Sequence, residues 1–163
     1  MEITMKQLGE ILIEAETSLG EILEILRDVG EEKHGGYFTI FDSFLRAPLL
    51  TAMIGLMPSE KFEKYREYSL EKATRLSHAP FDHKSSWQSR NPDKEQWGGA
   101  VYAEHGFIFS FSGLPEIADE ALVLAIASNM GFMTHDEATR IAMKSKNGYY
   151  IVLREKFDAR CLP

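Results

Sequence analysis

Residues 107–112 carry phenylalanine at every second position, a period of two that is typical of a β-strand. The three phenylalanines are expected on one face of this strand. A His-Gly turn precedes it, so residues 99–104 are expected to pair with 107–112 as a hairpin. Residues 37–42 follow a Gly-Gly pair and are rich in aromatic and β-branched side chains, which predicts another strand. The apolar run 49–57 indicates a strand or, because of its leucines and methionines, a buried helical turn.

Apolar positions three or four residues apart predict helices in much of the remaining chain. Two Ser/Thr-x-x-Gln/Glu capping boxes each begin an apolar stripe near the N-terminus, which predicts two consecutive helices or one long helix bent near residues 17–20. Ser59 is placed to cap a helix through about residue 76, and Thr134 to cap a short helix to about residue 144. Residues 117–127 are apolar almost all round, so a helix there would be buried on more than one side.

The C-terminal part completes the pattern with a turn at Asn147-Gly148 and an expected final strand at Tyr149–Leu153. No linker or repeat divides residues 1–163, so we expect a single domain. The expected fold class is α/β (α+β), with an antiparallel sheet flanked by helices. N-terminal helices and an extra C-terminal helix-strand segment complete it.

Charge and cysteine content narrow the range of partners. The 163 residues carry 25 acidic and 18 basic side chains for a net charge of −7, which would repel a phosphate backbone, so no nucleic-acid partner is expected. No apolar stretch approaches the roughly 20 residues that span a bilayer, so no membrane partner is expected either. The single Cys161 cannot form an intrachain disulfide, which fits a cytoplasmic location.

Residues 77–98 lack an apolar period, and a loop of this length in a compact domain often carries function. His78, Asp82 and His83 lie close together in it. Imidazole and carboxylate groups bind divalent metals and haem iron, so these three residues are candidate metal ligands. Their spacing matches no established ligand frame outside a helix, and the alternative is that they are ordinary exposed loop residues.

Trp87 and Arg90 in the same loop offer flat surfaces that could stack on a planar anionic ligand such as a tetrapyrrole. The alternative is that the loop packs over the sheet and uses its tryptophans as anchors. If a ligand site exists in this loop, we expect it to be formed by His78, His83, Trp87 and Arg90.

Six short motifs, most of them turn and packing residues, follow one another along the middle of the chain. They are Asp42, Lys72-Ala73, Gly98-Gly99-Ala100-Val101, His105-Gly106, Ser112-Gly113 and Asp119-Glu120. Their order resembles the GlcG/HbpS family, which also contains the C-terminal domain of PduO-type proteins. The resemblance implies a profilin-like sheet flanked by helices, oligomers, and binding of haem or another small ligand in some members, without an established reaction. The chain departs from the family in the phenylalanines of 107–112, where the family has glycines, and in residues 131–163, which have no counterpart.

Three hypotheses for the function follow. The first is a cytoplasmic small-ligand-binding protein that resembles GlcG/HbpS, with haem, another tetrapyrrole or a small organic acid as ligand and the 77–98 loop as a cover. The second is an enzyme that uses His78 or His83 as a general base or as a ligand for a divalent metal. The third is a non-catalytic interaction module that forms homo-oligomers, in part through the apolar helix at 117–127. A pocket with aromatic walls would favour the first, converging titratable groups the second, and neither feature the third.

Overall fold

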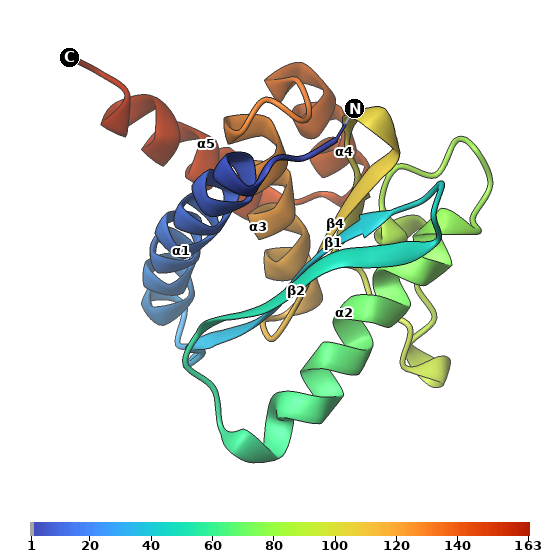
Figure 1. The fold of residues 1–163 in the computed structure, drawn as a ribbon. Helices are drawn as coiled ribbons and strands as arrows, with labels where there is room; N and C mark the ends of the chain where they lie inside the picture. Colours follow the sequence, from blue (N-terminus) through green and yellow to red (C-terminus); the bar gives the residue numbers. More distant parts are fainter. Residues whose placement is uncertain (1) are drawn as a thin grey trace.

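A computed structural model describes residues 2–163. Within this part of the chain, the centre of the fold is a four-stranded antiparallel sheet in the order β2-β1-β4-β3 (Figure 1). Its strands are β1 (Gly35–Asp42), β2 (Ala47–Gly55), β3 (Ala100–Tyr102) and β4 (Phe107–Ser112). The expected antiparallel sheet is therefore confirmed, and the apolar run around residue 50 is a strand.

In the described residues, five α-helices flank this sheet. They are α1 (Met5–Asp28), α2 (Phe62–Ser77), α3 (Glu116–Asn129), α4 (His135–Ser145) and α5 (Gly148–Arg160). The α2 helix covers one face of the sheet, α1 and α3 cover the other, and α4 and α5 pack against α3 (Figure 1). This arrangement confirms the α+β class. Across residues 2–163, no helix combines the length and the apolarity that crossing a membrane requires.

The side chains of β4 follow the predicted alternation. Its three phenylalanines belong to the large core between the sheet and the α1/α3 layer. Ile108 belongs instead to a smaller apolar cluster under α2. The α2 side of the sheet also buries Ser110, whose hydroxyl donates to the carbonyl oxygen of Ser69 at 2.7 Å. The face under α2 is therefore the more polar of the two.

The N-terminal segment is one continuous helix, which settles the choice between one helix and two. Thr4 caps it in the predicted capping box, with Gln7 as its partner. Ser18, the expected cap of a second helix, lies inside the same helix and donates to Glu14 Oε1 at 2.7 Å. Its hydroxyl is therefore used within the helix rather than for a new helix start.

The predicted strand at Tyr149–Leu153 is wrong, because this segment is helical and belongs to α5. The side chain of Asn147 caps the helix by accepting from the backbone N–H of Tyr150 at 3.4 Å. Tyr150 and Leu153 are both buried and lie three positions apart, so they form one helical stripe on the helix that packs against α3. Strand preference depends strongly on context, and packing against α3 decides the conformation here.

The β3 strand is shorter than the predicted range 99–104. Residues 104–106 form a 3₁₀ turn in which His105 has a left-handed φ of +61°. A residue in this conformation cannot continue a strand, so the hairpin closes through a wider turn than the His-Gly dipeptide predicts.

The apolar helix that was expected to form an oligomer surface is not free. Residues 118–128 of α3 are all buried within the chain, where the sheet, α1, α4 and α5 pack around them. This central position explains why the helix is apolar almost all round. The expectation of an oligomer contact at 117–127 is therefore corrected, because the chain covers this helix itself.

Phe109→Ala should destabilise the protein strongly. The ring is fully buried, with its centroid 5.7 Å from that of Phe38 and 5.5 Å from that of Phe132. Loss of a buried phenylalanine ring costs about 3–5 kcal/mol of unfolding free energy. Phe81 is 94% exposed, so Phe81→Ala is the control and should change that free energy by less than about 0.5 kcal/mol. Urea denaturation measures both, and equal losses in the two variants would contradict the core assignment.

Candidate functional site

A buried ion pair joins the two helical layers near the point where β4 leads into α3. Lys72 of α2 donates through Nζ to Asp119 Oδ2 at 2.8 Å and to the carbonyl oxygen of Phe111 at 2.9 Å. Asp119 Oδ1 accepts from the backbone N–H of Leu114 at 2.9 Å. Both charged side chains are only 2% exposed. Protein groups therefore replace most of the water around this pair.

The close approach of the two charges depends on Gly99. Its φ of +123° lies in the region that favours glycine. A Cβ at this position would lie 2.8 Å from Asp119 Cβ and 2.9 Å from Lys72 Nζ. The second glycine of the Gly-Gly motif before β3 thus leaves the space that the ion pair fills.

Burial gives the carboxyl group of Asp119 an unusual acidity. The loss of hydration raises the pKa of Asp119 from an ordinary 3.8 to about 6, although the charge and hydrogen bond of Lys72 and the N–H of Leu114 lower it. A carboxyl group with this pKa can take up or release a proton close to neutral pH. Such groups are typical of general acids and bases and of proton-linked binding sites.

A groove of about 260 Å³, which we call the α2 groove, reaches this ion pair. Tyr65 and Tyr68 of α2 and Trp97 of the 77–98 segment give it aromatic walls. Burial and the nearby carboxylate of Glu95 raise the pKa of Tyr68, so its hydroxyl stays protonated. The full lining is Lys64, Tyr65, Tyr68, Lys72, Trp97, Ser112, Gly113, Leu114, Glu116 and Asp119.

Glu116, the second acidic residue of the α2 groove, already has an ion-pair partner and a hydrogen-bond donor within the protein. Arg90 pairs with its carboxylate, with Nε 3.1 Å from Oε2. The backbone N–H of Gly98 donates to the same oxygen at 2.8 Å. The other charges of the lining are the Lys72–Asp119 pair and the ammonium group of Lys64.

Another buried carboxylate, Glu120, does not line the α2 groove. It accepts hydrogen bonds from the hydroxyls of Ser85 and Ser145 and from Asn147 Nδ2, the last at 3.0 Å. Burial raises the pKa of Glu120, and these three donors oppose that rise. The carboxylate links the 77–98 segment to the end of α4 and the cap of α5, so its role is structural.

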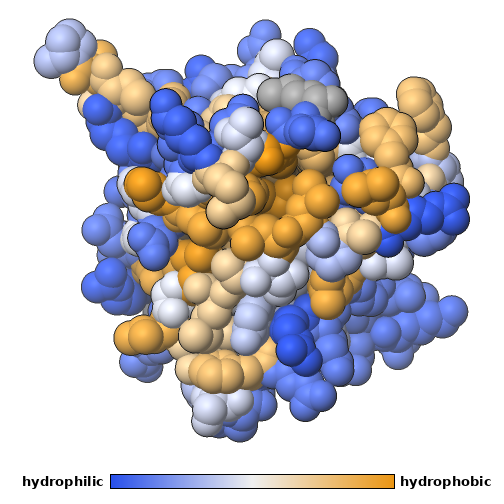
Figure 2. Space-filling model, in the orientation of Figure 1, coloured by the Kyte–Doolittle hydropathy of each residue, from blue (hydrophilic) through white to orange (hydrophobic). Residues whose placement is uncertain are grey.

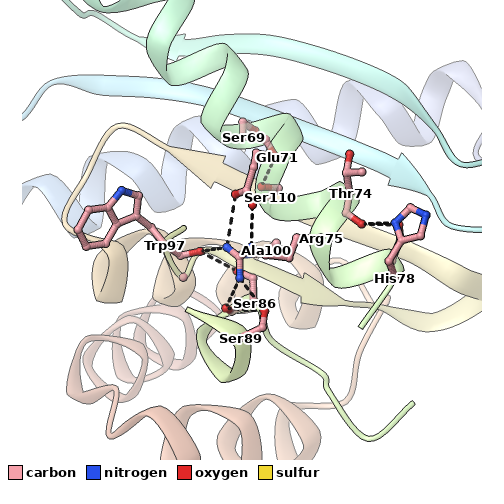
Figure 3. Close-up of polar contacts among 12 residues, drawn as sticks. Ser69, Glu71, Thr74, Arg75, His78, Ser86, Ser89, Trp97, Ala100 and Ser110 are labelled. Carbon is pink, nitrogen blue, oxygen red and sulfur yellow. Dashed lines mark hydrogen bonds and ion pairs between the residues drawn. The ribbon is translucent and has the colours of Figure 1, made fainter. Parts of the chain in front are cut away.

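Arg75 of α2 fixes the 77–98 segment to the body of the protein (Figure 3). Its guanidinium donates to the carbonyl oxygen of Ser86 at 2.9 Å, to Ser89 Oγ at 2.6 Å and to the carbonyl oxygen of Trp97. These contacts attach the segment to α2, so it packs against the body of the protein; that its tryptophans act as anchors stays a prediction.

The structure does not bring the predicted metal ligands His78, Asp82 and His83 together. His78 follows the last residue of α2, and its Nδ1 lies 2.8 Å from the carbonyl oxygen of Thr74 (Figure 3). The chain then turns, with His83 N donating to the carbonyl oxygen of Pro80 at 2.9 Å. Within residues 2–163, no three His, Cys, Asp or Glu side chains form a group that could hold a metal ion. None of the three predicted ligands lines the α2 groove.

Trp87 and Arg90 do lie together, but they contact each other. The guanidinium of Arg90 lies 4.5 Å from the centre of the Trp87 ring and also pairs with Glu116. Trp87 packs against Gly98, where an added Cβ would lie 3.0 Å from Trp87 Cε3. Arg90 thus stacks on Trp87, whereas the sequence predicted that both would contact a ligand.

Sequence reasoning missed the ion pair at the floor of the α2 groove. Lys72 shares the inward stripe of α2 with Ser69 and Leu76, where a charged residue is unusual. Asp119, like the adjacent Glu120, interrupts the apolar residues of α3. Charged residues at inward helical positions are almost never fully buried unless paired, so these two positions carried a usable signal.

Comparisons with known protein families, with curated proteins and with solved structures found no match to this chain. The resemblance to the GlcG/HbpS family therefore stays a prediction, and the candidate site rests on its geometry.

As the pH rises from about 4 to about 6, the protein should lose the free energy of unfolding that Asp119 contributes. The folded-state pKa of Asp119 is raised, so the folded protein binds this proton more tightly than the unfolded chain does. The contribution is therefore fully present below pH 3.8 and is lost as the pH rises through about 6. A shift of this size corresponds to on the order of 3 kcal/mol of unfolding free energy.

The reference for this measurement is the double variant Lys72→Met with Asp119→Leu. Replacing a buried ion pair by apolar residues of similar volume is often neutral or stabilising, whereas either change alone should cost about 3–5 kcal/mol because one buried charge stays unpaired. Urea denaturation across the pH range gives the difference between wild type and double variant. Parallel pH profiles for the two proteins would contradict the raised pKa.

Proposed function

We propose that the protein binds a small aromatic acid in the α2 groove, with the carboxylate of the ligand on Lys72. The observation that carries this proposal is the hydrogen-bonding capacity of Lys72. An ammonium group has three N–H donors. Within residues 2–163, Nζ has two acceptors, Asp119 Oδ2 and the carbonyl oxygen of Phe111. The third donor has no acceptor among these residues, and because Lys72 lines the α2 groove, the proposal assigns this donor to a ligand oxygen.

The charges of the α2 groove support an acidic ligand. Glu116 is already paired with Arg90, and Lys64 adds a second positive charge to the lining. Asp119 repels an anion while it is ionised, but its pKa of about 6 allows it to take up a proton when the anion binds. Binding is then linked to protonation and becomes tighter below pH 6.

Size and shape support a small planar ligand. Clefts that hold drug-sized molecules have volumes of roughly 300–1,000 Å³, and the α2 groove has about 260 Å³. Tyr65, Tyr68 and Trp97 are suited to contact with a flat ring. A tetrapyrrole would extend out of this groove. Among the residues that line the groove, only the two tyrosines belong to a type that ligates haem iron.

The proposal is for binding without catalysis. The enzyme hypothesis placed the base or metal ligand at His78 or His83, and neither residue lines the α2 groove. A cytoplasmic location belongs to the same proposal, supported by the single exposed Cys161, which is not part of a disulfide.

Benzoate is the probe for this proposal, and Trp97 reports its binding. Trp87→Phe leaves Trp97 as the only tryptophan of the chain, so the fluorescence change comes from the groove. Benzoate should bind roughly tenfold more tightly at about pH 5.5 than at about pH 7.5, because protonated Asp119 no longer competes for Lys72. Benzamide has the same ring without the charge and should not show this pH dependence.

Two double variants test whether the ligand binds in the α2 groove or at the histidines of the 77–98 segment. Lys72→Met with Asp119→Leu should weaken benzoate binding at least about tenfold, or about 1.4 kcal/mol. His78→Ala with His83→Ala is the matched control and should bind benzoate as the wild type does. Haem uptake, followed by the Soret band, is measured on the same variants. The proposal fails if the wild type does not bind benzoate or if the groove variant keeps full affinity, and haem uptake that needs the two histidines would move the site to the segment.

A further inference from the structure

Among residues 2–163, one edge of the sheet is open, and it is β2. The strand order places β2 and β3 at the two edges. At the β3 edge, Tyr102 N donates to the carbonyl oxygen of Lys84 at 2.9 Å, and Ser85 pairs with Val101 in an isolated bridge. The 77–98 segment therefore covers β3. In the described sheet β2 pairs only with β1, and Figure 1 shows it along the front.

The backbone of β2 presents unpaired groups outward. Leu56 N donates to the carbonyl oxygen of His34 at 3.1 Å, and these two residues continue the register in which Gly35 lies opposite Gly55. Directly opposite pairs in an antiparallel ladder alternate between hydrogen-bonded and non-hydrogen-bonded. It follows that Leu50, Ala52 and Ile54 direct their backbone groups to β1. It also follows that Thr51, Met53 and Gly55 direct theirs away from the sheet.

Pro48 and the register shift beside Phe41 protect the start of β2, but the side chains of residues 50–55 do not protect this edge. The nine residues of the strand carry no charge, although the chain has a net charge of −7. Leu49 and Met53 are 43% and 45% exposed. Figure 2, in the orientation of Figure 1, shows hydrophobic residues gathered across the middle of this face within a hydrophilic border. Natural edge strands usually avoid pairing with other chains by means of charges, prolines or bulges.

We infer that β2 pairs with β2 of a second copy of this chain, antiparallel and across a two-fold axis, so that the two sheets become continuous. Pro48 lacks an N–H, and the register shift beside Phe41 disturbs the ladder there, which confines the pairing to residues 51–55. An axis through Met53 uses every outward group in this range. It places Met53 opposite Met53 of the second copy and Thr51 opposite Gly55, whose left-handed φ of +75° ends the ladder there.

Two features of the structure favour a second copy as the occupant. Because β3 is covered, copies of this chain cannot stack edge to edge through β2 and β3 into an open fibre. Pairing β2 with β2 instead gives a closed two-fold dimer. Because the strand is uncharged, this arrangement places no like charges opposite each other in the ladder, despite the net charge of the chain. The inference does not rest on the proposed ligand.

Amide hydrogen exchange tests the inference residue by residue. At high micromolar concentration the amides of Thr51, Met53 and Gly55 should be protected, and dilution should reduce their protection at least about tenfold. The amides of Leu50, Ala52 and Ile54 pair with β1 and should stay protected at both concentrations, which also reports that the sheet is intact. Sedimentation at the higher concentration should give twice the 18.5 kDa of one chain.

Charge substitutions at Met53 test the position of the axis. Met53→Lys and Met53→Glu should each give a monomer, because like charges then stand directly opposite, and a mixture of the two should dimerise again. Ile151 is 43% exposed on α5, so Ile151→Lys is the matched control and should leave the dimer intact. A monomeric wild type, a dimer whose outward amides exchange freely, or a dimer that survives both Met53 substitutions would overturn the inference.

Discussion

The buried ion pair of Lys72 and Asp119 is the constraint that the packing around the end of β4 has to satisfy. Removing each charge from water costs several kcal/mol, so the pair requires partners for its other polar atoms. The carbonyl oxygen of Phe111 and the N–H of Leu114 supply them, and Gly99 leaves the space. Since α2 and α3 lie on opposite faces of the sheet, their pairing closes the fold around the end of β4. The apolar cluster under α2 is small, and α2 reaches the end of β4 through this polar contact as well.

In the proposed function, the same pair determines which ligands the α2 groove would recognise. A wholly apolar floor would bind flat rings without regard to charge, whereas Lys72 and Asp119 make the floor sensitive to an anion and to pH. Lys72 is held at two points, and the segment that carries Trp97 is attached through Arg75. A ligand would therefore meet groups that are already in place, which reduces the entropic cost of binding.

The parts of the fold that the sequence predicts are those determined by near neighbours. The alternation in residues 107–112 and the capping box at Thr4 are local, and both are present. Tyr149–Leu153 suits either a strand or a helix, and contact with α3 decides between them. Lys72 and Asp119 are 47 positions apart, so no local pattern connects them. The histidines of the 77–98 segment show the opposite case. Local composition predicts a metal site there, but the structure does not bring the predicted ligands together.

Glu120 has a consequence for the order in which the protein can fold during synthesis. Two of the three donors to its carboxylate come from Ser145 and Asn147, far beyond α3 in the chain. Until the ribosome has released these residues, burying the carboxylate would leave it short of hydrogen bonds, which is costly for a charged group. Strand pairing in the sheet can form earlier, but burying the side of α3 that carries Glu120 would be costly before then. The residues that follow α3 are thus needed to complete the core.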